Sequence, residues 1–167
     1  KFSLWDGEGK AFAQCQEDYC EIVVFTGFFK NHEINQLDAL LCHEVGHFLG
    51  LKHTNNSILS DVEKSSYAIE GEADYYSTSV CLKRVTVLCE KELIKLSFSA
   101  IAMTRSGEPT NLDGSNPKNR DARLGTNMSY PSSNCRYASL IAGIYQKERP
   151  SCWYVPNDLI PVQFRRH

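Results

Sequence analysis

Residues 33–49 carry the strongest helical pattern in the chain, and any fold of this sequence has to accommodate that helix. Its apolar side chains recur every three or four residues, at Ile34, Leu37, Leu41, Val45 and Phe48. Gly50 follows directly, and glycine favours the end of a helix. We therefore expect an amphipathic helix from Glu33 to Leu49.

The same segment contains the sequence His43-Glu44-Val45-Gly46-His47. The i, i+4 spacing places both imidazoles on one helix face, so two nitrogens can bind one Zn²⁺ at about 2.0–2.1 Å. Glu44 would lie beside the metal, where it can take the proton of a zinc-bound water and pass it to a leaving amine. The pattern predicts zinc as cofactor, His43 and His47 as ligands, and Glu44 as the catalytic residue of a peptidase.

Two arrangements could supply the third ligand, and the first uses His53. The run from His43 to His53 fits the H-E-x-x-H-x-x-G-x-x-H pattern of metzincins, in which a glycine turn lets a third histidine reach the metal. Such a site also needs a downstream Met-turn. Asn127-Met128-Ser129-Tyr130-Pro131 is the candidate for it.

The second arrangement takes the ligand from the next predicted helix, which spans roughly Ser66 to Leu88. Its run Glu70-Gly71-Glu72-Ala73-Asp74 gives E-x-x-x-D, which resembles the gluzincin pattern. In that family the Glu binds zinc, and the carboxylate one turn later orients a ligand histidine through its second ring nitrogen. Residues four apart share a helix face, so both carboxylates can face the metal. The resemblance implies Glu70 as a ligand and Asp74 as its supporting residue.

Further blocks of the chain resemble a group of exported bacterial gluzincin-like proteins. These blocks are Glu70–Thr78 with Cys81–Arg84, Tyr130-Pro131, Asn134–Arg136 and Arg149–Trp153, within a resemblance that runs from about Leu40 to Trp153. The wider resemblance favours Glu70 over His53. The chain departs from the group in having Leu51-Lys52-His53 after the glycine, and Tyr130 where the group would have histidine.

The resemblance also suggests supporting residues. A peptidase of this kind needs a donor for the oxyanion of its tetrahedral intermediate. Tyr130 is the candidate, because a phenol can substitute for the histidine of the group, and Tyr75 and Tyr76 are alternatives. Arg136 could be a buried structural cation or a substrate clamp, and we favour the structural role.

Elsewhere the sequence predicts an α+β fold, with an N-terminal twisted β-sheet and a mostly helical C-terminal part. The predicted elements are strands at Phe2–Trp5, Ala11–Ala13 and Glu21–Phe29, and helices at Glu90–Met103 and Cys135–Tyr145. The strand from Ile22 to Phe29 could border the cleft and pair with extended substrate, or it could be a core strand.

We expect one zincin-like domain over 1–167. Within it, residues 1–32 are predicted to be mainly β, 33–103 to form a helical core with the metal site, 104–130 to be a long loop, and 131–167 to be a helix and tail.

Seven cysteines are many for a cytosolic protein of this length. The pairs Cys15/Cys20 and Cys135/Cys152 lie in turn-rich stretches where disulfides would stabilise the fold. Cys42 lies on the apolar side of its helix, and we expect it to be the unpaired one. The cysteine content predicts a secreted or periplasmic protein, and because the sequence begins at Lys1 we expect that an upstream segment has been removed.

The net charge of -2 gives no long-range attraction to nucleic acid. No apolar run approaches the roughly 20 residues that span a bilayer. We therefore expect neither nucleic acid as a partner nor a membrane span. We also expect a monomer that acts on protein or peptide substrates, and an endopeptidase rather than an exopeptidase. The alternatives are a non-catalytic zincin-fold binding module, against which Glu44 argues, and a zinc amidase acting on cell-wall peptide.

Overall fold

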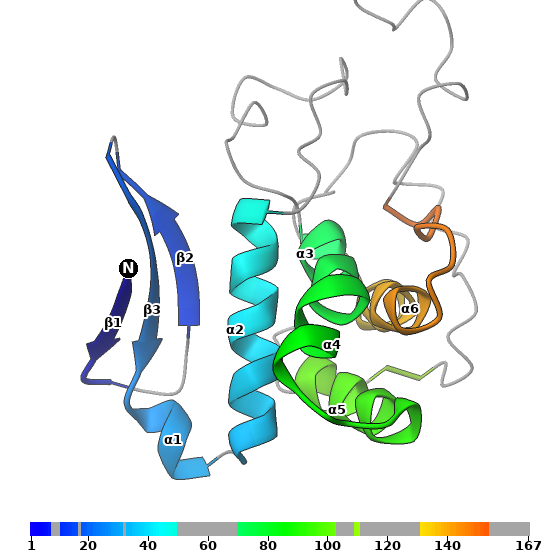
Figure 1. Cartoon of the computed structure of the whole chain (residues 1–167), viewed down its shortest axis with the longest axis horizontal. Coiled ribbons are helices and arrows are strands. Elements are labelled where there is room, and N and C mark those ends of the chain that lie inside the picture. The colour runs from blue at the N-terminus through cyan, green and yellow to red at the C-terminus, as the bar shows by residue number, and fades with distance from the viewer. Residues whose placement is uncertain are drawn as a thin grey trace, which may run out of the picture.

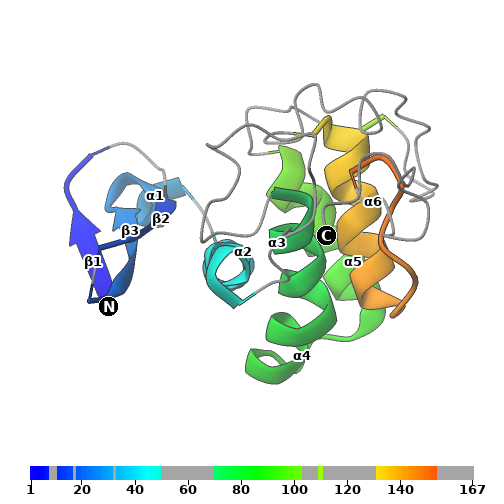
Figure 2. The same ribbon diagram turned by 90° about the horizontal axis from the view of Figure 1, so that it is seen from above.

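Helix α2 (Ile34–Leu49) stands between two parts of the fold, a small sheet with a short helix after it on one side and the helices from residue 70 onward on the other (Figure 1). The view from above shows the same three-part arrangement (Figure 2). The structure is a computed structural model that describes residues 1–7, 11–16, 18–31, 33–49, 70–102, 109–110 and 131–153. It is α+β with mostly helical content, which confirms the predicted fold class and is consistent with a single zincin-like domain.

The sheet contains three strands, β1 (Phe2–Trp5), β2 (Ala11–Cys15) and β3 (Cys20–Phe25), in the order β1-β3-β2. β1 is parallel to β3, and β2 is antiparallel to it. Because successive side chains point to opposite faces, the complete burial of both Val23 and Val24 shows that β3 is covered on both faces. β3 is thus a central core strand, and its predicted alternative role as a cleft edge that pairs with substrate is wrong.

The predicted strand Glu21–Phe29 is too long at its C-terminal end. The strand ends at Phe25, and residues Gly27–Asn31 form the short helix α1. At this turn the Thr26 hydroxyl donates a hydrogen bond to the Asp6 carboxylate over 2.9 Å, which joins the ends of β1 and β3.

Helix α2 matches the predicted Glu33–Leu49 to within one residue. Its buried positions include Ala39, Cys42 and Gly46, which are three and four residues apart and form one helix face. The predicted apolar stripe is less buried than this face, because Ile34 is exposed and its other members are half-buried, namely Leu37, Leu41, Val45 and Phe48. The most deeply buried face of the helix is therefore the one with Ala39, Cys42 and Gly46, beside the predicted stripe.

The second predicted helix consists of three consecutive pieces, α3 (Glu70–Tyr76), the π-helical turn η2 (Ser77–Cys81) and α4 (Leu82–Val85). Residues before Glu70 in the predicted helix lie outside the described ones. The helix ends at Val85 rather than at the predicted Leu88. The chain leaves the helix at Thr86, whose backbone is extended and whose N–H donates to the Leu82 carbonyl oxygen. The Cys89 N–H then donates a 2.8 Å hydrogen bond to the Glu92 carboxylate at the start of the next helix.

That helix, α5, spans Glu90–Ala102, and α6 spans Ser133–Ile144, both close to their predicted bounds. Every residue of α6 from Cys135 to Ile144 is buried. The main core lies where α2, α4, α5 and α6 meet and contains Ala39, Cys42, Leu82, Leu93, Leu96, Ile101, Tyr137, Leu140, Ile141 and Ile144. The metal-motif helix is therefore part of the core.

Two disulfides brace this helical part, Cys42–Cys81 and the predicted Cys135–Cys152. The prediction that Cys42 is unpaired is wrong, because the buried face of α2 lies against η2 and brings Cys42 to Cys81. Among the described cysteines, Cys89 is free and exposed. Cys20 is also disulfide-bonded. These bonds fit an oxidising environment.

The predicted long loop 104–130 lies outside the described residues except for 109–110, and so does the tail beyond Trp153. Within the described part of the chain, no helix is long and apolar enough to span a membrane.

Replacing both Cys42 and Cys81 by alanine should lower the free energy of unfolding by up to about 4 kcal/mol. The chain-entropy estimate for a bond that closes a separation of 39 residues gives this value. Urea unfolding monitored by circular dichroism measures the change. Cys89→Ser, which alters the exposed thiol, should unfold like the parent chain, and equal stability of all three proteins would contradict the bracing role of the disulfide.

Candidate metal centre

Three side chains from two helices converge on one point. α2 contributes His43 and His47, one turn apart, and α3 contributes Glu70 at its first position. One ligand atom from each lies within 4.8 Å of the other two. Nε2 of His43 is 3.3 Å from one Glu70 oxygen, and Nε2 of His47 is 3.7 Å from the other. These three groups could hold one metal ion.

The two helices can approach closely because the motif has glycine at position 46. A Cβ atom on Gly46 would lie 2.7 Å from both Cα and the carbonyl oxygen of Ala73, well inside van der Waals contact. The backbone of α3 therefore occupies the space of a missing side chain on α2. This contact is what brings Glu70 within reach of the histidines.

The orientation of the His43 ring is set by Asp74. Oδ1 of Asp74 lies 2.8 Å from Nδ1 of His43, so the other ring nitrogen, Nε2, faces Glu70. A metal-binding histidine commonly donates its second N–H to a carboxylate, which fixes its tautomer and orientation. Asp74 and His43 have the geometry of such a pair.

Arg136 of α6 joins this group from the opposite side. Its Nε and Nη2 atoms donate to the two Asp74 oxygens over 2.7 and 2.8 Å, a bidentate pair that is almost fully buried. Nη2 also lies 3.2 Å from Oε2 of Glu70. Arg136 is therefore a buried cation held by carboxylates, which agrees with the predicted structural role. Its Nε and Nη2 atoms are engaged by Asp74 and Glu70.

These contacts shift the pKa values of the buried groups. Burial would lower the pKa of His43, but the charge and hydrogen bond of Asp74, together with Glu70, raise it to about 10. Burial would raise the pKa of Asp74, but Arg136 and His43 lower it to about 2. In the metal-free protein, His43 is thus positively charged at neutral pH and both carboxylates are ionised, since the pKa of Glu70 is also lowered against its burial by His43 and Arg136.

The donor set fits zinc. Two imidazoles and one carboxylate form a known ligand set of catalytic zinc sites, which keep a fourth position open. The side chains of His43, His47 and Glu70 are 14%, 15% and 19% exposed, so the group is partly accessible to solvent. Glu44, next to His43 on α2, is buried at 6% exposure.

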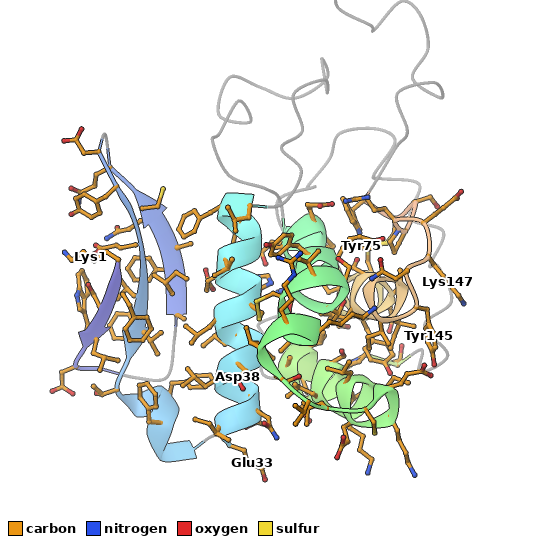
Figure 3. All side chains as sticks on the ribbon, viewed as in Figure 1. Lys1, Glu33, Asp38, Tyr75, Tyr145 and Lys147 are labelled. Atoms are coloured by element: carbon orange, nitrogen blue, oxygen red, sulfur yellow. A yellow bond between two sulfur atoms is a disulfide. The ribbon has the colours of Figure 1, made fainter. Side chains whose placement is uncertain are left out.

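Other candidate residues are either outside the described part of the chain or occupied elsewhere. Tyr130, His53 and Met128 lie outside it. The Tyr75 hydroxyl donates to the Lys147 carbonyl oxygen over 2.9 Å, and both residues lie on the α6 side of α3 (Figure 3). Tyr75 is therefore unsuited to the oxyanion role considered above.

The partners of Arg136 could not be predicted from the sequence. It lies 62 residues from Asp74, and an arginine that follows a cysteine carries no motif of its own. The available signal was the E-x-x-x-D run itself, because two buried carboxylates on one helix face need a nearby cation.

Replacing Gly46 by alanine should destabilise the protein by roughly 1–3 kcal/mol, because the new methyl group would overlap the Ala73 backbone and force α2 and α3 apart. An unhindered helical Gly→Ala change would instead stabilise by about 0.5–1 kcal/mol. Urea unfolding therefore distinguishes the two signs. Zinc affinity should fall as well, and a stabilised variant with parental affinity would contradict the close contact.

The metal-free protein should lose about 2 kcal/mol of stability as the pH falls from about 4 to about 2. The lowered pKa of Asp74 stabilises the fold above the ordinary value of 3.8, and this contribution disappears as the pH drops through the folded value of about 2. Urea unfolding at several pH values tests this. Asp74→Asn should lack this part of the pH dependence, whereas Asp18→Asn, at an exposed turn, should retain it; matching profiles for parent and Asp74→Asn would contradict it.

Comparison with known proteins agrees with this site. The family model of Peptidase family M48 matches residues 6–69, a stretch that includes His43, Glu44 and His47 and ends one residue before Glu70. No curated protein and no solved structure matches the chain. M48 peptidases are metal-dependent, typically with zinc. The family match and the His43–His47–Glu70 group together support a zincin-like metallopeptidase.

Proposed function

We propose that this protein is a zinc-dependent peptidase that holds its metal through His43, His47 and Glu70. The observation that carries the proposal is the convergence of these three ligand atoms within 4.8 Å, from two helices that pack through a glycine contact. The match of residues 6–69 to a metallopeptidase family supports the peptidase part of the proposal, whereas the assignment of Glu70, which lies outside that match, rests on the geometry.

The reaction requires a metal, a base and an oriented ligand set. Zinc bound here would polarise the scissile carbonyl and lower the pKa of a water molecule in its open position. Glu44 takes the proton of the attacking water and passes it to the leaving amine. Asp74 holds His43 with Nε2 toward the metal position. Glu44 therefore supplies proton transfer, and Asp74 supplies ligand orientation.

Glu70 is the proposed third ligand in preference to His53. Glu70 contacts both histidines within 3.7 Å, and Asp74, one turn later, contacts His43. These two contacts support the gluzincin arrangement over the metzincin one, in which His53 would bind the metal and Met128 would form the Met-turn.

For the oxyanion we propose Tyr130 as hydrogen-bond donor, from the position before Pro131. Tyr75 is engaged by Lys147, and Tyr76 is the remaining alternative. The proposed substrate is a protein or peptide, and the proposed mode is endopeptidase cleavage by a monomer. The disulfides of the helical part support an exported enzyme, secreted or periplasmic.

Glu44→Gln should reduce the hydrolysis of a fluorescent protein substrate by about 10²- to 10⁴-fold, because the base is removed and the ligands remain. The variant should still retain close to one equivalent of zinc by mass spectrometry after brief exposure to a chelator. His47→Ala and Glu70→Ala should lose the zinc under the same conditions. His53→Ala should keep it, and the exposed-site variant Glu33→Gln should behave as the parent chain in both assays.

Three results would count against this proposal in different ways. Parental turnover by Glu44→Gln would remove Glu44 as the base. Zinc loss only in His53→Ala would identify His53 as the third ligand and so favour the metzincin arrangement. A parent chain that binds zinc but cleaves no peptide would favour a binding module, or an amidase if it releases products from cell-wall fragments.

A further inference from the structure

Helix α3 carries three acidic residues at alternate positions, Glu70, Glu72 and Asp74. Alternate helix positions differ by about 200°, so Glu72 faces away from the side shared by Glu70 and Asp74. Glu72 and Asp74 are each only 2% exposed. Carboxylates buried so close together need positive partners.

Two arginines from the C-terminal part of the chain supply these partners, one on each side of α3. Arg149 donates to both oxygens of Glu72, with distances of 2.6 and 2.9 Å, and its guanidinium lies 4.4 Å from the centre of the Tyr75 ring. Arg136 forms the equivalent bidentate pair with Asp74. The two ion pairs are chemically alike, but only that of Arg136 lies on the metal side.

The Arg136 fork contacts the proposed ligand Glu70 and also Asp74, which in turn contacts the proposed ligand His43. Its Nη2 atom lies 3.2 Å from Glu70 Oε2 and 2.8 Å from Asp74 Oδ1. The same Asp74 oxygen lies 2.8 Å from Nδ1 of His43. One guanidinium nitrogen therefore restrains Glu70 directly and His43 through a single carboxylate.

We propose that Arg136 is a positioning residue that keeps Glu70 and His43 in the geometry that binds zinc, whereas Arg149 stabilises only the fold. This inference rests on the ligand set of the proposed function. It extends that function by assigning the metal affinity of the site to a residue of α6 that is not itself a ligand.

Charge and position predict opposite effects for Arg136. A cation near the site repels Zn²⁺, so if charge alone mattered, removing Arg136 would tighten zinc binding. Positioning predicts weaker binding, because groups that orient metal ligands typically contribute about 10- to 100-fold in affinity. Lysine at the same place keeps the charge, but a single ammonium group cannot reproduce the planar fork shared among three oxygens.

The test is the Zn²⁺ affinity of the full chain, measured by competition with a chromophoric chelator for the parent, R136K, R136Q, R149K, R149Q and E70A. Both Arg136 variants should bind zinc at least about 10-fold more weakly. Both Arg149 variants should bind zinc like the parent. The urea midpoints of the Arg136 and Arg149 variants should all fall, because each variant loses a buried bidentate ion pair. The visible absorption of bound Co²⁺, which reports ligand geometry, should change in the Arg136 variants and stay unchanged in the Arg149 variants.

Parental or tighter zinc binding by folded R136K would overturn the inference, as would an equal weakening in R136K and R149K. R136K retains the charge that Asp74 needs, so the test does not depend on whether R136Q folds. Failure of the underlying proposal has a different signature, because then the parent binds no zinc or E70A binds it as tightly as the parent. Loss of zinc by E70A with normal binding by R136K would overturn the role of Arg136 alone.

Discussion

Helices α2 and α3 meet at Gly46 and Ala73 with no side chain between their backbones, and the arrangement of the metal centre follows from this contact. His43 and Glu70 belong to different helices and lie on either side of a stretch that the structure does not describe. Their distance is therefore set by helix packing. A glycine inside a helix normally costs stability, but here it allows two rigid elements to present their ligands to the same point. Rigid elements hold such sites more accurately than loops do.

A balance of buried charge organises the second half of the fold. α3 brings three carboxylates into the protein, and Arg136 and Arg149 bring two cations from α6 and the turn that follows it. The same C-terminal turn is fixed by the Cys135–Cys152 disulfide and by Trp153, whose indole N–H donates to the Ser139 hydroxyl over 2.7 Å. When α6 and this turn pack against α3, their arginines therefore also neutralise the acidic residues of α3.

Sequence reasoning was most successful where the pattern was local. The apolar spacing within 33–49 predicted α2, and the E-x-x-x-D run placed Glu70 and Asp74 on one helix face, where the structure also has them. It failed where the outcome depended on distant partners. Cys42 resembled an ordinary core cysteine until packing placed Cys81 beside it, and the central position of β3 depends on a parallel strand from the start of the chain. The connection of Arg136 to the metal centre is another contact of this kind.

The long separation of these contacts has a consequence for how the protein is made. Arg136 approaches His43 across 93 positions of the chain and bonds to Asp74 across 62. Ribosomes deliver the chain from its N-terminus, so both histidines and Glu70 emerge well before α6 exists. A nascent chain carries the acidic residues of α3 without their buried counter-ions and lacks the helix on which α3 packs. The contacts around the metal centre can therefore be completed only after residue 136 has been synthesised, 62 residues after Asp74.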